Sequence, residues 1–196
     1  MQSSVPIPDF DCNATMFKNI ANTLSDTTMR MFCSLYFPYI LANNQTKQND
    51  YHGVSIFFLS ERNSCRSQMA EAILRNFDSE LEIYSAGLDP ADHISPIAIE
   101  VMKEIGIDIQ PVEPRRFDEF ADRRFTYLIT VGESTHEELD IPTGIKYERK
   151  LHLGFRSPYK NSKSHDEIRQ KCREVRDELV NELEYFYFRI IKKSVC

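Results

Sequence analysis

The chain has 196 residues, a length that fits one domain, or one domain with an extension. Hydrophobic residues make up 41% of the chain and charged residues 28%, a balance typical of a soluble globular protein. The net charge of −6 argues against a nucleic-acid binder, because contacts to phosphate backbones need clustered Lys and Arg.

The cysteines indicate a reducing compartment. They are odd in number and widely scattered, with neither metal-ligand spacing nor a disulfide framework: Cys12, Cys33, Cys65, Cys172 and Cys196. The first ten residues lack the basic and apolar regions of a signal peptide. We therefore expect a cytoplasmic protein without a metal or another cofactor. The most apolar stretch, residues 31–41, is too short to span a bilayer and contains Pro38, so no membrane association is expected.

Residues 1–50 precede the part of the chain where strands and helices alternate. Residues 14–24 and 25–36 have helical patterns, and the polar stretch 43–51 is typical of a linker. The sequence predicts an N-terminal helical extension over residues 1–50, acting as a cover rather than a separate module, and a main domain over residues 51–196.

From Val54 onward the pattern alternates between strand and helix. Strands are predicted at residues 54–59, 81–86, 125–131 and 146–151. Helices are predicted at residues 69–77, 95–105 and 165–191, with Ser95 as an N-cap, Pro96 in the first turn and Gly106 at the end of the second helix. This alternation is typical of an α/β fold, in which helices cover both faces of a parallel sheet.

The stretch VSIFFLSERNSCRSQM, residues 54–69, is the most informative part of the sequence. A buried strand runs into a polar loop, and the loop runs into a helix. Loop amides and the positive end of a helix dipole then point at one spot, which favours an anion. Arg66, at the end of the loop, adds a planar fork of donors that matches a tetrahedral oxyanion.

Several motifs in order resemble the low-molecular-weight protein tyrosine phosphatases and the related thioredoxin-coupled arsenate reductases. They are Asn63-Ser64-Cys65-Arg66-Ser67, Gln68-Met69-Ala70-Glu71, Ser85-Ala86-Gly87, Gly132-Glu133-Ser134 and Ser157-Pro158-Tyr159. The resemblance covers about residues 54–190. It implies a three-layer sandwich with a central four-stranded parallel sheet, and a ligand of the phosphate, arsenate or phosphotyrosine type. A protein partner is left open.

The resemblance also implies roles for individual residues. The oxyanion would be bound by the loop formed by Glu61, Arg62, Asn63, Ser64, Cys65, Arg66 and Ser67. Arg66 would be the clamp, Ser67 the hydroxyl that steadies the nucleophile, and Asn63 the residue that holds the loop in shape. Arg62 would either tighten anion binding or crowd the loop. Tyr159 would line the mouth of the substrate cleft.

Two catalytic positions depart from the family pattern. Ser60 stands where the family has its nucleophilic cysteine, and an alcohol is barely ionised at neutral pH without an adjacent base. Ser157 stands where the family has the aspartate that protonates the leaving group. The segment 132–138 also lacks the further cysteines of the arsenate reductases.

Three interpretations follow from these departures. The first is a domain that retains the oxyanion loop but has lost its chemistry. The second is an active phosphatase or arsenate reductase that is seen here as a Cys-to-Ser variant, and the third is a serine-based enzyme. Whether the chain is an enzyme stays open. Cys65 and Cys172 are expected to be packing residues, and His152 a satisfied surface or core histidine. The pairs Arg115-Arg116 and Arg123-Arg124 are expected to form a solvated face.

Overall fold

The computed structural model describes residues 53–109, 113–134 and 139–192. The predicted extension over residues 1–50 lies outside the described residues and stays a prediction. The strands are β1 (Ser55–Ser60), β2 (Glu82–Gly87), β3 (Arg124–Gly132) and β4 (Lys146–Gly154). The helices are α3 (Arg66–Phe77), α4 (Pro96–Lys103) and α5 (His165–Phe186), with a 3-10 helix η2 (Phe117–Phe120) and a π-helical turn η3 (Tyr187–Ile191).

The four strands form one parallel sheet in the order β2-β1-β3-β4. All six residues of β1 are buried, because this strand is flanked by a strand on each side and covered on both faces. Its last residue, Ser60, lies opposite Gly87 of β2 and Val131 of β3. The carboxyl ends of the three strands therefore meet at the place where the loop after β1 begins.

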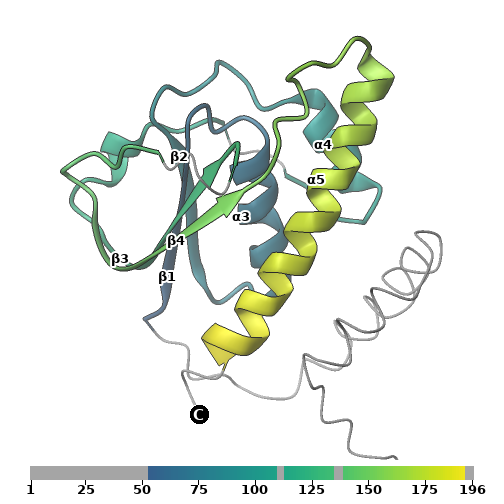
Figure 1. Ribbon diagram of the computed structural model, residues 1–196. Helices are drawn as coiled ribbons and strands as arrows, with labels where there is room; N and C mark the ends of the chain where they lie inside the picture. Colours follow the sequence, from purple (N-terminus) through teal and green to yellow (C-terminus); the bar gives the residue numbers. More distant parts are fainter. Residues whose placement is uncertain (1–52, 110–112, 135–138, 193–196) are drawn as a thin grey trace, which may run out of the picture. The chain divides into compact units, whose positions relative to one another are not determined.

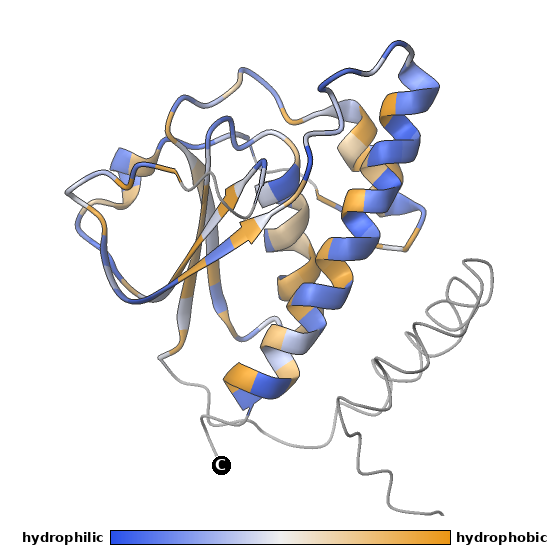
Figure 2. Ribbon diagram, viewed as in Figure 1, coloured by the Kyte–Doolittle hydropathy of each residue, from blue (hydrophilic) through white to orange (hydrophobic). Residues whose placement is uncertain are grey.

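Helices α3 and α5 pack together on one side of the sheet, and α4 packs against α5 (Figure 1). The buried apolar residues of α5 follow a helical period: Cys172, Val175, Leu179, Leu183 and Phe186. Figure 2 shows the opposite, hydrophilic surface of this helix as an almost continuous blue band. The amphipathic pattern in the sequence thus places α5 over the sheet as predicted.

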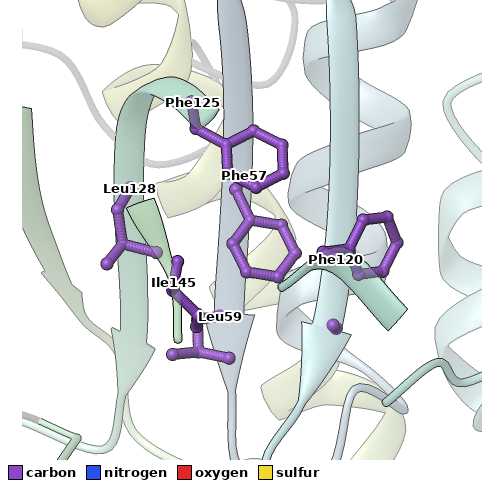
Figure 3. Packing of buried hydrophobic residues seen from close by; sticks show 7 residues of the cluster. Phe57, Leu59, Phe120, Phe125, Leu128 and Ile145 are labelled. Atoms are coloured by element: carbon purple, nitrogen blue, oxygen red, sulfur yellow. The ribbon is translucent and has the colours of Figure 1, made fainter. Parts of the chain in front are cut away.

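An aromatic cluster covers the other face of the sheet (Figure 3). Phe57 of β1 stacks on Phe125 of β3 with ring centroids 4.6 Å apart, and Phe120 of η2 lies 5.1 Å from Phe57. Ile145 joins the cluster from the segment before β4. The predicted α/β fold with a central four-stranded parallel sheet is confirmed. Within the described residues, the layer on this face consists of a 3-10 helix and loops rather than α-helices.

Some element boundaries differ from the prediction. Helix α3 begins at Arg66, three residues earlier than expected, since Cys65 already serves as its N-cap. Strand β4 extends to Gly154 rather than ending at residue 151. It is an edge strand whose first five residues are exposed and lie within the predicted range, while the three residues beyond that range, 152–154, are half-buried. Within the described residues, no helix is long and apolar enough to cross a membrane.

Candidate oxyanion site

The loop between β1 and α3 lies at the carboxyl edge of the sheet (Figure 1). The chain connects β1 to β2 on one side and later returns to place β3 on the other side. In parallel α/β sheets, this reversal of strand order opens a crevice beyond the carboxyl ends of the strands. The loop after β1 therefore occupies the position where such folds bind their ligands.

The backbone carbonyls of the loop are held from outside by the segment that follows β2. Four amides of this segment donate to them at 2.8–3.0 Å: Leu88 to Ser60, Asp89 to Glu61, Ala91 to Arg62 and Ser95 to Ser64. In a trans peptide the N–H points opposite to the preceding C=O. The amides of residues 61, 62, 63 and 65 consequently face the inside of the loop. The Asn63 amide shows this direction, since it donates to the Ser60 hydroxyl at 3.1 Å.

Gly87 allows the loop to approach β2 this closely. A Cβ at this position would lie 2.9 Å from the carbonyl oxygen of Glu61 and 3.2 Å from Cβ of Asn63. Both neighbours belong to the loop, and the nearest is backbone that cannot swing away. The glycine of the Ser85-Ala86-Gly87 motif is thus a steric requirement of the loop.

Asn63 anchors the loop from within. Its φ of 47° lies in the left-handed region, which asparagine tolerates better than most residues, and the residue is only 1% exposed. Its side-chain amide donates to Ser67 Oγ at 3.0 Å and to Ser85 Oγ at 2.9 Å. Its Oδ1 accepts from Gln68 Nε2 and from the Arg115 amide, both at 2.9 Å. All four hydrogen-bonding positions of the carboxamide are therefore used.

Ser60 and Ser67 lie together at the centre of the loop. Their hydroxyl oxygens are 2.7 Å apart, and the two residues are 6% and 1% exposed. Ser60 is the last residue of β1, while Ser67 lies in the first turn of α3. The predicted nucleophile position therefore faces the N-terminus of a helix and a second hydroxyl.

Arg66 binds the carboxyl ends of two strands. Its Nη1 donates to the carbonyls of Gly132 and Phe155, each at 2.6 Å. Burial lowers the pKa of Arg66 from its usual value, and the charge of Glu133 acts in the opposite direction. Among the described residues, no side chain or carbonyl accepts from its Nη2. The guanidinium is thus fixed by one nitrogen and keeps a donor edge for a ligand.

Arg62 does not crowd the loop. Its guanidinium forms an ion pair with Asp89 at 2.5 Å, and both side chains are more than half exposed. Glu61 is also exposed, and Ser64 is half-buried. The backbone amides of residues 61 and 62, not their charged side chains, are therefore the groups that this geometry offers to a ligand.

Cys65 occupies the N-cap position of helix α3 without a side-chain capping hydrogen bond, and its thiol is buried next to the thiol of Cys172 on α5. The interaction with Cys172 raises the pKa of Cys65 well above its usual value, and burial raises it further. Cys65 is thus a protonated packing residue at neutral pH.

Tyr159 lies before α5, and its hydroxyl hydrogen-bonds to Ser95 Oγ at the start of α4. The tyrosine is 42% exposed, which fits the predicted place at the mouth of a cleft. Ser157, two residues earlier, is half-buried, and its carbonyl accepts from the Lys160 amide at 3.3 Å. The expectation that a hydroxyl at this position is a poor proton donor stays a prediction.

Near the loop, the structure shows two ion pairs of Glu71 that were not predicted from the sequence. Arg115 was expected on a solvated face, and that prediction is wrong. Its guanidinium binds the buried carboxylate of Glu71 on α3 at 2.5 Å, while Arg75 binds the other oxygen at 2.7 Å. Glu71 is 2% exposed and lies three residues after Gln68 on the buried side of the helix. That helical spacing is the signal that predicts a buried, and therefore paired, Glu71.

His152 lies near the site without entering it. Its Nδ1 is 2.8 Å from Thr130 Oγ1 and its Nε2 is 2.8 Å from the carbonyl of Ser134. Both ring nitrogens are engaged, as expected for a satisfied histidine. In the described residues no group of His, Cys, Asp and Glu side chains is arranged to hold a metal ion.

Comparisons with known proteins agree with this geometry. Residues 55–195 match the model of the low molecular weight phosphotyrosine protein phosphatase family. The arsenate reductase of Halalkalibacterium halodurans is 33% identical over 132 residues, which cover 67% of this chain and 93% of that protein. The arsenate reductase of Bacillus subtilis is 34% identical, with the same coverage of both chains.

Solved structures show the same fold. An arsenate reductase in its reduced state superposes with a TM-score of 0.55 at 26% identity, covering 68% of this chain and 95% of the other. An arsenate reductase in its phosphate-binding state superposes with a TM-score of 0.52 at 22% identity, covering 73% and 99%. The chain therefore belongs to the low molecular weight phosphotyrosine protein phosphatase family.

Proposed function

We propose that this domain binds a phosphate-type oxyanion in the loop of residues 60–66. The observation that carries this proposal is the direction of the loop amides, which face inward because their carbonyls are held from outside. These amides lie at the N-terminus of α3, where the helix dipole adds further positive potential. The structural neighbour in its phosphate-binding state fits this proposal.

Arg66 would complete the site. Two carbonyl contacts fix its Nη1, so the guanidinium does not need to be ordered when a ligand arrives. A preorganised guanidinium loses less conformational entropy on binding than a mobile one. The edge that carries Nη2 would then bind one or two oxygens of a phosphate or arsenate group.

We further propose that the chemistry of the family is impaired in this chain. Among the described residues, the groups within hydrogen-bonding distance of the Ser60 hydroxyl are the Ser67 hydroxyl and the Asn63 amide. Neither is a base that could take up the serine proton. Ser157 would not protonate a leaving group, and the segment after β3 has no cysteine to relay a disulfide. Binding without efficient turnover is the function that these residues support.

The free thiols of Cys65 and Cys172 agree with a reducing compartment, and we propose the cytoplasm as the location.

Isothermal titration with inorganic phosphate tests the binding proposal. Phosphate should bind the unmodified protein, and Arg66→Ala should lose most of the affinity. Arg124→Ala is the matched control, because it removes the same charge at the start of β3, where the side chain is 71% exposed. Equal affinities for the two variants would place the anion elsewhere. Circular dichroism melting would verify that Arg66→Ala is folded, since this change also removes two contacts to carbonyls.

A further inference from the structure

The donor and acceptor of each hydrogen bond around Ser60 can be assigned one after another, starting from the backbone amide of Arg115. The Arg115 amide donates to Asn63 Oδ1 at 2.9 Å. A backbone N–H is always a donor, so this contact fixes which atom of the Asn63 carboxamide is oxygen. The nitrogen of that carboxamide therefore faces Ser67 and Ser85.

The hydrogen bonds of the Ser67 hydroxyl can be assigned next. Asn63 Nδ2 donates to Ser67 Oγ at 3.0 Å, so this hydroxyl already accepts one hydrogen bond. Ser67 is 1% exposed, and its own proton needs an acceptor, because a buried unsatisfied donor is costly. Among the described residues, the Ser60 oxygen at 2.7 Å is the acceptor within reach. Ser67 consequently donates to Ser60, not the reverse.

Ser60 is left with a proton to give. Its oxygen accepts from Ser67 and from the Asn63 amide, which occupies both lone pairs. Its proton has no acceptor among the described residues, although Ser60 is only 6% exposed. The Asn63 amide reaches Ser60 from the inner side of the loop, so the Ser60 hydroxyl is part of the surface that would face the anion.

We infer that the Ser60 hydroxyl donates a hydrogen bond to the bound oxyanion, which makes this loop a receptor for tetrahedral dianions such as sulfate and hydrogen phosphate. This inference rests on the proposed function. A thiolate at the same position would accept hydrogen bonds only, and its negative charge would oppose a dianion. The change from thiol to hydroxyl thus removes a nucleophile and adds a donor at the same position.

Inorganic sulfate is the probe that tests the inference. It stays a dianion between pH 5 and pH 9, and it has no ester bond that the protein could hydrolyse. Ser60→Ala should lower the affinity for sulfate by about tenfold or more, the usual effect of losing one hydrogen bond to a charged group. Ser60→Cys should bind sulfate progressively more weakly than the unmodified protein as the pH rises from 5 to 9, since the cysteine ionises and serine does not. The ionisable neighbours Arg66, Glu71, Arg115, Glu133 and Lys160 are shared by both proteins, so the comparison removes their contribution.

The outcomes separate the two proposals. If the unmodified protein fails to bind sulfate and phosphate, the proposed function itself is wrong. If Arg66→Ala abolishes binding while Ser60→Ala retains full affinity, the anion site stands and the donor role of Ser60 is wrong. If Ser60→Ala does not fold, sulfate binding by Ser60→Cys at pH 5 decides alone: a protonated thiol is only a weak hydrogen-bond donor, so an affinity equal to that of the unmodified protein would overturn the inference.

Discussion

At the scale of single residues, the proposal of impaired chemistry depends on two serines, Ser60 and Ser157, at the positions where the sequence analysis expects a cysteine and an aspartate. The environment of residue 60 is still that of an activated nucleophile, with a helix N-terminus, a hydroxyl and a backbone amide directed at it. These are the features that lower the pKa of a cysteine. Under the proposed function, the side chain at position 60, rather than the scaffold around it, would limit the chemistry.

We expect Ser60→Cys to restore slow hydrolysis of p-nitrophenyl phosphate, whose leaving group needs little protonation. Adding Ser157→Asp should then accelerate phenyl phosphate, a poorer leaving group, by about 10²–10⁴, the usual contribution of a positioned acid. Ser157→Asp alone should do nothing, because an acid without a nucleophile has no bond to break. Steady-state kinetics of the three variants on both substrates measure this. Hydrolysis by the unmodified protein that disappears in Arg66→Ala would contradict the impaired chemistry.

Residues that are close in sequence were predictable at this site, and a residue from a distant segment was not. Ser60, Asn63, Arg66 and Ser67 were predicted to act together, and the structure brings them into one loop because they are neighbours in sequence. Arg115 was missed, although its amide contacts Asn63 and its side chain binds Glu71. It comes from a segment without helical or strand periodicity, 52 residues after Asn63, and a local pattern carries no information about such a contact.

At the scale of elements, the segment after β2 shapes the oxyanion loop as much as the loop's own residues do. Four hydrogen bonds join amides of the segment after β2 to carbonyls of the loop, and the loop lies close to β2 at Gly87. The Ser85-Ala86-Gly87 motif was recognised from the sequence, but its physical reason was not. A glycine is required at position 87 because a Cβ there would lie 2.9 Å from the Glu61 carbonyl oxygen. This distance is known only from the structure.

Gly87→Ala should therefore displace the loop. We expect a loss of about 1–3 kcal/mol in the free energy of unfolding, the usual cost of forcing an extra methyl into a packed site. Sulfate binding should weaken in parallel, because the inward amides move. Urea unfolding and isothermal titration measure the two effects. Gly144→Ala is the control: its Cβ would meet Ala121 at an ordinary 3.7 Å, so both quantities should stay near those of the unmodified protein. A Gly87→Ala variant that also matches the unmodified protein would disprove the steric argument.

At the scale of the whole domain, helices α4 and α5 are joined by ion pairs as well as by apolar contacts. Glu104, at the end of α4, binds Arg173 at 2.6 Å and Arg176 at 3.0 Å, both on α5. The hydrogen bond from Arg173 is the main cause that lowers the pKa of Glu104, and Arg176 adds to it against the effect of burial. A carboxylate with a lowered pKa stabilises the folded state while it is ionised.

The contribution of Glu104 to the free energy of unfolding depends on pH. The contribution of Glu104 is complete above the ordinary glutamate pKa of about 4.3 and is lost as the pH falls through the lower pKa of the folded state. We expect the unmodified protein to lose more unfolding free energy between pH 6 and pH 3 than Glu104→Gln does. Urea unfolding at both pH values measures this difference. Arg173→Gln should reduce it as well, and the double variant should not add to the single ones. Parallel pH profiles for the unmodified protein and Glu104→Gln would exclude the linkage.

The global architecture was predictable where periodicity was strong. Alternating strands and helices indicated a parallel α/β sheet, and the stripe on α5 identified the residues that cover it. The layer around Phe57, Phe120 and Phe125 was not predictable, since η2 and the segment before β4 have no period to detect. The edge strand β4 was predicted three residues too short at its half-buried end. Apolar clusters built by irregular segments depend on contacts between distant parts of the chain.

The contacts of Asn63 and Arg66 also bear on when the site comes into existence during synthesis. The partners of Asn63 lie up to 52 residues away in sequence, and those of Arg66 lie 66 and 89 residues further along the chain. A peptide of residues 54–77 contains the entire signature, yet none of the groups that turn its carbonyls outward or fix its guanidinium. On a ribosome, the signature emerges early, but the proposed receptor would be complete only after β4 has joined the sheet and brought the Phe155 carbonyl to Arg66. Recognition of the anion would therefore be a late product of folding, even though the signature is encoded in one short stretch of sequence.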